Sequence, residues 1–318
     1  MLSRVADTLY WMSRYLERAE HIARLLDLQL HMMVELEPEA AEQRWERIFN
    51  SLYVPLPGKP LDPYGRTQIL AFDSANANSI SACVSAAREN ARHVREQISS
   101  EMWEEVNRLS LQVKSTRLDK IWNDQPHEFF LSVKQGIHLF QGITDSTMNH
   151  GEGWQFIQMG RWIERSLATA ALLRIHYSAW PGLNYHQTAT STFMEWIALL
   201  KSCTAFEAYC KVYTADLRPD RIAEFLILNP EFPHSIRFAA NGLHSALQAV
   251  AQSTESKRAR QVNRLAGRLR ATLDYGQVDE IINSGLYTYL NDIESQCNQI
   301  HDSIYHTYIT YPIEELVS

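Results

Sequence analysis

Apolar residues recur every three or four positions from the first residues of the chain. The first stripe consists of Val5, Leu9, Met12, Leu16, Ala19, Ala23, Leu26 and Leu30. This spacing predicts one long amphipathic helix over 3–35. The same periodicity predicts further helices over 40–53, 102–117, 127–149, 152–178, 190–213, 219–228, 234–252, 256–274 and 278–308. Alternating patterns typical of strands are nearly absent, so we predict an all-α chain.

The loops follow from turn-forming and capping residues. The segment VPLPGKPLDPYG after Tyr53 is rich in Pro and Gly and predicts the longest loop. Asp73 and Ser79 are both candidate N-caps for a helix rich in Ala, Arg and Glu. A short break is expected at 99–101.

The sequence also repeats itself. SRYLERA at 13–19 returns as GRWIERS at 160–166, which is 147 positions later. Asp73-Ser-Ala-Asn-Ala-Asn-Ser-Ile80 resembles Asn229-Pro-Glu-Phe-Pro-His-Ser-Ile236, and the regions around Trp45 and Trp196 match more weakly. Three matches in the same order predict an internally duplicated helical bundle. Its two similar halves, 1–150 and 151–318, would pack about a pseudo-two-fold axis into one compact body.

Composition and charge exclude several classes of protein. The chain has 318 residues with 45% hydrophobic and 21% charged residues, as is typical of a globular protein and not of a disordered one. Its net charge of −7 argues against a dedicated nucleic-acid binder, which would be expected to carry a basic domain. The four cysteines lie far apart, which favours reduced thiols in a cytoplasmic protein. The first residues lack the apolar core of a signal peptide, and no run of ~18 apolar residues predicts a membrane span.

The repeated motif is the strongest candidate for chemistry. Arg14, Glu17 and Arg18 lie at i, i+3 and i+4 and therefore share one side of a helix. Their second copy, Arg161-Trp-Ile-Glu164-Arg165, lies in a helix that is apolar nearly all round and so is expected to be buried. Buried charges need partners, and the simplest partner of each motif is the other copy. A cluster of four Arg and two Glu would bind a carboxylate or phosphate through bidentate contacts, or would simply fix how the halves dock.

Two further basic stretches are candidates for binding. Arg88, Glu89 and Asn90 lie in a helix with Arg92 and Arg95, and form either the edge of a ligand site or a solvated face. The helix predicted at 256–274 carries six basic residues, which fit an acidic partner surface or an ordinary basic surface. These are Lys257, Arg258, Arg260, Arg264, Arg268 and Arg270.

Motifs of common enzyme classes are absent from the sequence. It contains no GxGxxG after a strand, no GxxxxGK[ST], no HExxH and no GxSxG, and no ExxH pair within a predicted helix suggests a metal site. We therefore predict no cofactor and no metal. If the chain is an enzyme, burial could raise the pKa of Glu17 or Glu164 and make one of them the general base of an amide- or acyl-transfer reaction.

Three segments together resemble the bacterial alpha-E family of all-helical proteins. They are MLSRVADTLYWMSRYLERAEHIARLLD, the AREN segment at 87–90 and GWQFIQMGRWIERS. The resemblance implies an encoded association with a circularly permuted ATP-grasp ligase that forms amide bonds and with a transglutaminase-like protein. It thereby implies a role in making or modifying a peptide, without an established reaction.

The predicted function is therefore an auxiliary component that binds a substrate or partner in such an ATP-grasp-dependent system. Its ligand would be a peptide or an amino acid, bound by the Arg/Glu cluster with Arg88, Glu89 and Asn90 as possible further contacts. Two alternatives remain open at this point: an enzyme that uses Glu17 or Glu164 as its base, and a purely structural scaffold.

Overall fold

The computed structural model describes residues 1–33, 38–122, 125–180, 182–188, 192–214, 216–254 and 259–310. Every regular element in these ranges is a helix, so the all-α prediction is confirmed. None of the described helices has the length and apolar character needed to cross a bilayer.

Two long helices occupy the middle of the molecule. They are α1 (Ser3–Met32) and α8 (Glu152–Ser178), which pack against each other along much of their length. Helices of the N-terminal part surround α1: α2 (Pro38–Ser51), α3 (Pro63–Thr67), α4 (Ile80–His93), α5 (Ser100–Ser115), α6 (Leu118–Ile121) and α7 (Pro126–Thr147). Helices of the C-terminal part surround α8: α9 (Phe193–Ser202), α10 (Phe206–Tyr213), α11 (Pro219–Leu228), α12 (Ile236–Thr254), α13 (Ala259–Asp274), α14 (Val278–Ser284) and α15 (Leu286–Ile304).

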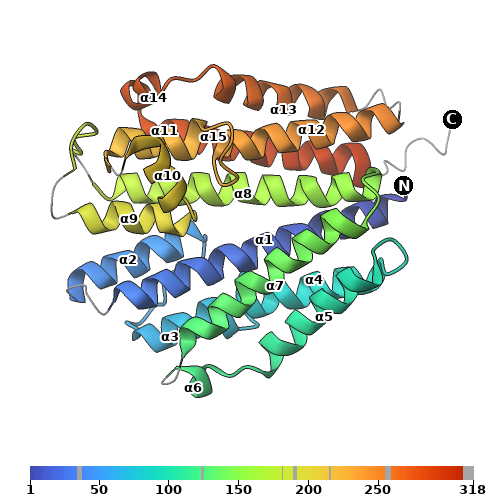
Figure 1. Cartoon of the computed structure of the whole chain (residues 1–318), viewed down its shortest axis with the longest axis horizontal. Coiled ribbons are helices and arrows are strands. Elements are labelled where there is room, and N and C mark those ends of the chain that lie inside the picture. The colour runs from blue at the N-terminus through green and yellow to red at the C-terminus, as the bar shows by residue number, and fades with distance from the viewer. Residues whose placement is uncertain are drawn as a thin grey trace.

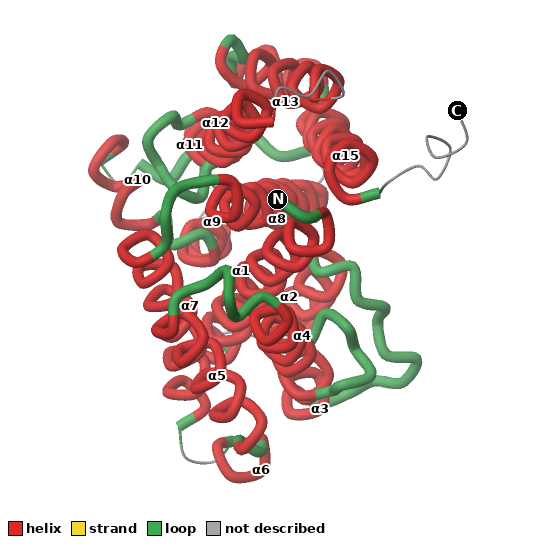
Figure 2. The backbone as a smooth tube through the Cα atoms, turned by 90° about the vertical axis from the view of Figure 1, so that its right-hand side faces the viewer, coloured by secondary structure: helices red, strands yellow, loops and turns green. Residues whose placement is uncertain are grey.

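Each long helix is the first member of a group of four. Helix α1 packs against α4 and α7, and α5 covers these two from outside. Helix α8 packs against α12 and α15, and α13 covers them in the same way. Figure 1 shows the first group below the α1–α8 layer and the second group above it, and Figure 2 shows the same stacking from the side. In addition α2 contacts α8, and α9 contacts α1.

One glycine allows α1 and α8 to approach closely. A Cβ atom added at Gly160 would lie 2.2 Å from the backbone oxygen of Tyr10 and 3.2 Å from the Cβ atom of Ser13. Only a residue without a side chain fits at this point, because the obstacle is the backbone of the facing helix. The position of Gly160 therefore fixes where the two helices cross, two turns or less from Glu17 and Glu164.

Several predicted boundaries are corrected by the structure. The helix predicted over 190–213 is divided at Thr204, whose φ is 52°, into α9 and α10, while 190–191 lie outside the described residues. The helix predicted over 278–308 breaks at Gly285, whose φ is 101°. It then ends in a π-helical turn, Tyr305–Ile309. The predicted loop after Tyr53 ends at α3, which Asp62 caps, and a second π-helical turn, Gln68–Phe72, follows.

The cap of α4 is Ser79 and not Asp73. The Ser79 hydroxyl accepts a hydrogen bond from the backbone N of Ala82 at 3.1 Å. Asp73 instead accepts from the backbone N of Ala75 and stabilises the turn before the helix. Ser235 similarly accepts from the backbone N of Phe238 at the start of α12.

Candidate functional site

The repeated Arg/Glu motifs meet where α1 crosses α8. Arg14, Glu17, Glu164 and Arg165 are all buried, with exposed fractions of 3–7%. Buried charges of this kind are tolerated only when they are paired and hydrogen-bonded. The structure brings them together in two clusters, one around each glutamate.

The Glu164 cluster consists of one carboxylate from α8 and two arginines from α1. Arg14 donates from Nε to Oε2 of Glu164 at 2.7 Å, and Arg18 donates from Nε to Oε1 at 2.6 Å. Arg18 also donates from Nη1 to Oδ1 of Asn78 at 2.7 Å, in the turn before α4. The cluster therefore joins α1, α8 and the start of α4.

Aromatic residues surround Arg14 on its other side. Its guanidinium carbon lies 4.5 Å from the centre of the Trp11 ring, and Nη1 lies 3.2 Å from Nδ1 of His301 in α15. The hydroxyl of Tyr10 lies 2.8 Å from the same His301 nitrogen. Burial, followed by the charge of Arg14, lowers the pKa of His301 to about 4, so the ring is neutral at pH 7.

The Glu17 cluster is the reciprocal arrangement with one arginine fewer. Arg165 donates from Nε and Nη2 to the two oxygens of Glu17, at 2.5 and 3.0 Å, which is a bidentate pair. Gln141 of α7 donates to Oε2 of Glu17 at 3.2 Å. Arg165 also donates from Nη1 to the backbone oxygen of Pro233, in the turn before α12.

Arg161 is the exception among the six motif residues. It makes no salt bridge within the described part of the chain, and its Nε is buried without a hydrogen-bond partner. Its guanidinium lies over the ring of Trp162, 4.8 Å from the centre, and burial together with Arg165 lowers its pKa. The expectation that Arg161 would pair with a glutamate of the other motif is wrong, because Gln141 and Arg165 already bind Glu17.

The charge state of Glu164 limits its chemistry. Burial alone would raise its pKa, but the charges of Arg14 and Arg18 and their hydrogen bonds lower it to about 2. A carboxylate with so low a pKa is a weak base at neutral pH. The structure therefore gives Glu164 the role of an anchor for two arginines and disfavours it as a general base.

A cavity of about 340 Å³ opens beside the Glu164 cluster. Arg14, Arg18 and Glu164 form its charged wall. The other walls are polar and apolar residues from α1, α2, α8, α15 and the connecting segments. They are His21, Ile22, Ser51, Leu52, Tyr53, Asn78, Leu167, Ala168, Ala171 and Asn298. A cavity of this size and mixed lining is typical of a small-molecule site.

His21 and Tyr53 give the cavity two unusual residues. Burial, with the nearby charge of Arg24, lowers the pKa of His21 to about 4, and its Nε2 is buried without a partner. Tyr53 has a left-handed backbone (φ 54°), and its hydroxyl bonds to Glu294 and to Arg174. Unpaired buried polar atoms and left-handed non-glycine residues cluster at functional sites.

The other predicted binding residues lie elsewhere. Arg88 pairs with Glu89 at 2.8 Å and donates to Asn107 of α5, also at 2.8 Å. Glu89 further binds Arg92, and Asn90 is half-buried one position along the helix. The structure places this group against α5 and does not bring it to the cavity lining.

The basic helix and the cysteines complete the list of candidates. Arg260, Arg264 and Arg268 are exposed on α13, Arg270 pairs with Asp274, and Lys257 and Arg258 lie outside the described residues. All four cysteines are free. Burial raises the pKa of three of them, Cys83, Cys203 and Cys297, to about 12, so these thiols are protonated at neutral pH.

Sequence reasoning missed the residues that complete the clusters. Gln141, His301 and Asn298 come from other helices and Asn78 from the turn before α4, and none of them belongs to the repeated Arg/Glu motif. Only Asn78 had a signal, because it lies in a repeated turn next to the N-cap Ser79.

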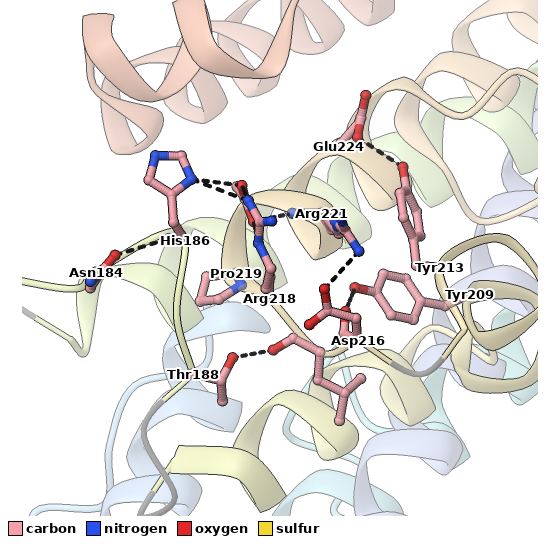
Figure 3. A network of polar contacts seen from close by, with 12 residues as sticks. Asn184, His186, Thr188, Tyr209, Tyr213, Asp216, Arg218, Pro219, Arg221 and Glu224 are labelled. Atoms are coloured by element: carbon pink, nitrogen blue, oxygen red, sulfur yellow. Dashed lines mark hydrogen bonds and ion pairs between the residues drawn. The ribbon is translucent and has the colours of Figure 1, made fainter.

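A second polar network was also missed, around the buried Asp220. Figure 3 labels other members of it, among them His186, Arg218 and Arg221. Asp220 accepts hydrogen bonds from Arg218, from His186 at 2.9 Å and from the backbone N of Arg221. Burial would raise the pKa of Asp220, but the hydrogen bonds from Arg218 and His186 lower it. The network ties the segment before α9 to the start of α11, and Thr188 adds a hydrogen bond to the backbone oxygen of Leu217.

An opposite-charge pair holds the last helix of each group to its long helix. In the first group Lys134 of α7 binds Asp27 of α1, with 2.5 Å between Nζ and Oδ2. In the second group the charges are reversed, and Arg174 of α8 binds Glu294 of α15, with 2.7 Å between Nε and Oε1. Arg174 lies 147 positions after Asp27.

Comparison with known proteins identifies the family. Residues 1–309 match the Alpha-E family, described as a predicted alpha-helical domain with a conserved ER motif, and the chain therefore belongs to this family. Uncharacterized proteins of Mycobacterium bovis and of Mycobacterium tuberculosis are 23% identical to it over 313 residues, which cover 91% of this chain and 34% of each relative. The chain thus spans about a third of the length of these relatives. No solved structure gives a significant match.

Proposed function

We propose that this Alpha-E protein binds a small carboxylate-bearing ligand, an amino acid or a short peptide, in the cavity beside Glu164. The observation that carries the proposal is the charged wall of that cavity. Two arginines share one glutamate there, so the wall keeps one positive charge in excess. A ligand carboxylate would neutralise that charge, and charge-assisted hydrogen bonds to arginine are among the strongest in proteins.

Arg18 is the residue best placed to contact the ligand. Its Nε and Nη1 are occupied by Glu164 and Asn78, whereas Nη2 makes no hydrogen bond to any described residue. Its side chain is 22% exposed, compared with 7% for Arg14. Ile22, Leu52 and Leu167 would cover the apolar body of the ligand.

The carboxylate site also fits the system that the family resemblance implies. An ATP-grasp ligase activates a carboxylate and joins it to an amine, so a partner that holds a peptide by its carboxylate would serve such a ligase. We therefore propose that the protein acts in the cytoplasm as the binding component of this ligase, together with a transglutaminase-like protein.

Matched peptides test the ligand proposal by calorimetry. The probes are amino acids and dipeptides of the form X-Leu, each with a free carboxylate or as the C-terminal amide, with phosphoserine and inorganic phosphate as further arms. We expect one free acid to bind at least about tenfold more tightly than its amide, and Arg18→Met to abolish this preference. Arg88→Met, an arginine outside the cavity, is the control and should bind as the wild type does.

Three outcomes would contradict the ligand proposal. One is equal affinity for acids and amides, and another is an unchanged preference in Arg18→Met. The third is binding of the phosphate arms alone, which would assign the cavity to phosphate. Filling the cavity with Leu167→Trp provides a second variant, and it should also remove binding while the helix content measured by circular dichroism stays the same.

Co-purification with the neighbouring ATP-grasp ligase tests the partner proposal separately. We expect a stable complex and a change in the amount of ligase product when the protein is omitted. If no complex forms and the product is unchanged, the partnership is wrong even when a ligand binds in the cavity.

The alternatives are affected differently by the geometry. The low pKa of Glu164 weighs against an enzyme with this residue as its base. The scaffold alternative has one observation in its favour: every Arg–Glu pair of the two motifs runs between α1 and α8. The peptide experiment separates ligand binding from a scaffold, because a scaffold would show no preference for carboxylates.

We further propose that the halves 1–150 and 151–318 arose by duplication and are related by a pseudo-two-fold axis. The reciprocal pairs Arg18–Glu164 and Arg165–Glu17 support it, as do the contacts of α2 with α8 and of α9 with α1. In an experimental structure, one rotation near ~180° should superpose α1, α4, α5 and α7 on α8, α12, α13 and α15. A different order or direction of these helices would contradict the duplication.

A further inference from the structure

Two histidines and an aspartate meet where the end of α1 faces the start of α7. Asp27 and His31 are one helical turn apart on α1, and His127 comes from α7. One ligand atom from each of the three residues lies within 4.8 Å of the other two. His127 Nδ1 lies 2.6 Å and His31 Nδ1 lies 3.6 Å from the same oxygen, Oδ1 of Asp27.

We propose that Asp27, His31 and His127 form a binding site for Zn²⁺ or a similar first-row divalent transition metal. Two imidazoles and one carboxylate are a donor set that suits these metals, whereas Ca²⁺ and Mg²⁺ prefer oxygen ligands alone. A single ion can approach Oδ1 of Asp27 and both Nδ1 atoms after small rotations of the rings. The metal would then replace two hydrogen bonds, the one between His127 and the Asp27 carboxylate and the one between His31 Nδ1 and the backbone oxygen of Asp27 at 3.0 Å.

Asp27 has the environment of a ligating carboxylate. It is 6% exposed, and its second oxygen, Oδ2, binds Lys134 at 2.5 Å. Carboxylates that bind metals are commonly held by such a hydrogen bond from a neighbouring side chain. Lys134 therefore orients the carboxylate and leaves Oδ1 to face the two histidines.

The histidines give the site access to solvent. The side chain of His31 is 59% exposed and that of His127 is 49% exposed. Three protein ligands leave at least one coordination position open to water or to another molecule. Bound metal would also connect α1 to α7 across 100 residues of sequence, so it should stabilise the folded chain.

This site does not depend on the cavity beside Glu164, because none of its three residues lines that cavity. The sequence contained one signal for it, the spacing Asp27-x-x-x-His31, which a search for HExxH and ExxH pairs passes over. His127 carries no such signal, because only the packing of α7 on α1 brings it to this place. The expectation of no metal is therefore replaced by a specific site to test.

Zinc titration of the full chain by calorimetry tests the proposal. We expect one Zn²⁺ per chain and a higher melting temperature with zinc. His31→Ala and His127→Ala should each weaken binding at least about tenfold, and the double variant should bind no zinc at this site. His138→Ala is the matched control: this histidine also lies on α7, is 56% exposed and has a carboxylate 3.5 Å away, but it belongs to no group of three possible ligands among the described residues.

Cobalt provides an independent readout of the ligands. Co²⁺ bound by nitrogen and oxygen donors at an open site should show visible absorption bands, which should persist in His138→Ala and disappear in the double variant. Because the His31 side chain is 59% exposed, metal-free His31→Ala should melt close to the wild type, whereas His127→Ala also loses the hydrogen bond to the buried Asp27 and should melt lower. The proposal is overturned if the wild type binds zinc no more tightly than the double variant, or if His138→Ala lowers zinc affinity as much as His127→Ala does.

Discussion

The two glutamates at the crossing of α1 and α8 lie in similar sequence motifs but have different neighbours in space. Glu164 accepts from two arginines, Arg14 and Arg18, and lies beside a cavity. Glu17 accepts from Arg165 and Gln141, while Arg161, the residue that corresponds to Arg14, has no carboxylate partner in the described structure.

The difference is caused by the helix that packs beside each motif. In the first group Gln141 of α7 donates to Glu17, which accepts from one arginine only. In the second group His301 of α15 lies beside Arg14 and leaves Glu164 free to accept from both arginines. A third helix thus presents an amide to the glutamate of the closed ion pair and an imidazole to an arginine of the cavity wall.

The largest effect is expected for Glu164→Gln. This change leaves the buried Arg14 and the partly buried Arg18 with a neutral partner, and removing one member of a buried ion pair costs about 3–5 kcal/mol. We expect the free energy of unfolding, measured with urea, to fall by that amount. Glu17→Gln leaves only Arg165 without its carboxylate and should cost less.

Glu89→Gln is the control for these two changes, because its ion pairs are exposed and should contribute little to the free energy of unfolding. Equal losses for Glu164→Gln and Glu17→Gln would show that the second arginine on Glu164 adds nothing.

The free energy of unfolding should depend on pH through His21, which lines the cavity beside Glu164. Its pKa of about 4 in the folded protein is below the unfolded value of about 6.5, so the unfolded chain binds the extra proton first. The contribution of His21 to stability should therefore be complete above about pH 6.5 and fall by about 3 kcal/mol as the pH drops to 4, and His301, whose pKa is also about 4, adds to the loss in the same window.

Urea unfolding at several pH values between 7 and 4 measures this effect. His21→Gln should flatten the dependence by close to one proton. The contribution of Glu164 to stability is separate. It is lost only as the pH falls from the unfolded pKa of about 4.3 to the folded pKa of about 2. An unchanged slope in His21→Gln would place the titrating group elsewhere.

Gly160→Ala tests whether the two clusters share one crossing. The added methyl group meets a backbone oxygen, which cannot rotate away, so α1 and α8 must move apart. Overpacking of this kind costs about 1–3 kcal/mol. In a crystal structure of the variant, the Arg–Glu distances of both clusters should increase together. Gly142→Ala is the control, because a methyl group added there meets no atom within 4 Å. If the Arg–Glu distances of one cluster stayed as in the wild type while those of the other increased, a shared crossing would be contradicted.

The smallest effect is expected for Arg161→Met. With no carboxylate to lose, the change removes only the contact with the Trp162 ring, which contributes about 0.5–1 kcal/mol. Arg165→Met should cost about 3–5 kcal/mol, because it leaves Glu17 buried without its ion pair. A loss of similar size for both variants would show that Arg161 has a partner in solution that the structure lacks.

The sequence predicts the helices and the meeting of the two motifs, but not the finer pairing. Apolar periodicity places α1 and α8 well, because long stripes leave few alternatives. The divisions at Thr204 and Gly285 depend on single residues with positive φ, of which only the glycine has a visible preference for that conformation.

The lack of a carboxylate partner for Arg161 among the described residues and the existence of the cavity could not be predicted, for another reason. Both depend on Gln141, His301 and Asn298, which reach the crossing from helices far away in sequence. Local patterns contain no information about which side chain a distant helix will present. The prediction that the motif charges would be paired is therefore confirmed for three of the four arginines, Arg14, Arg18 and Arg165. Arg161 has no such pair in the described structure.

The reversed charges of Asp27–Lys134 and Arg174–Glu294 have a consequence for how the chain reaches its native state. Helices α7 and α15 both have to find one of two long, similar helices while the protein folds. If α7 docked on α8 in the native register of α15, Lys134 would face Arg174, and α15 docked on α1 would bring Glu294 against Asp27. Like charges thus destabilise each exchanged arrangement. They favour docking of α7 on α1 and of α15 on α8, and they disfavour misfolded or domain-swapped forms.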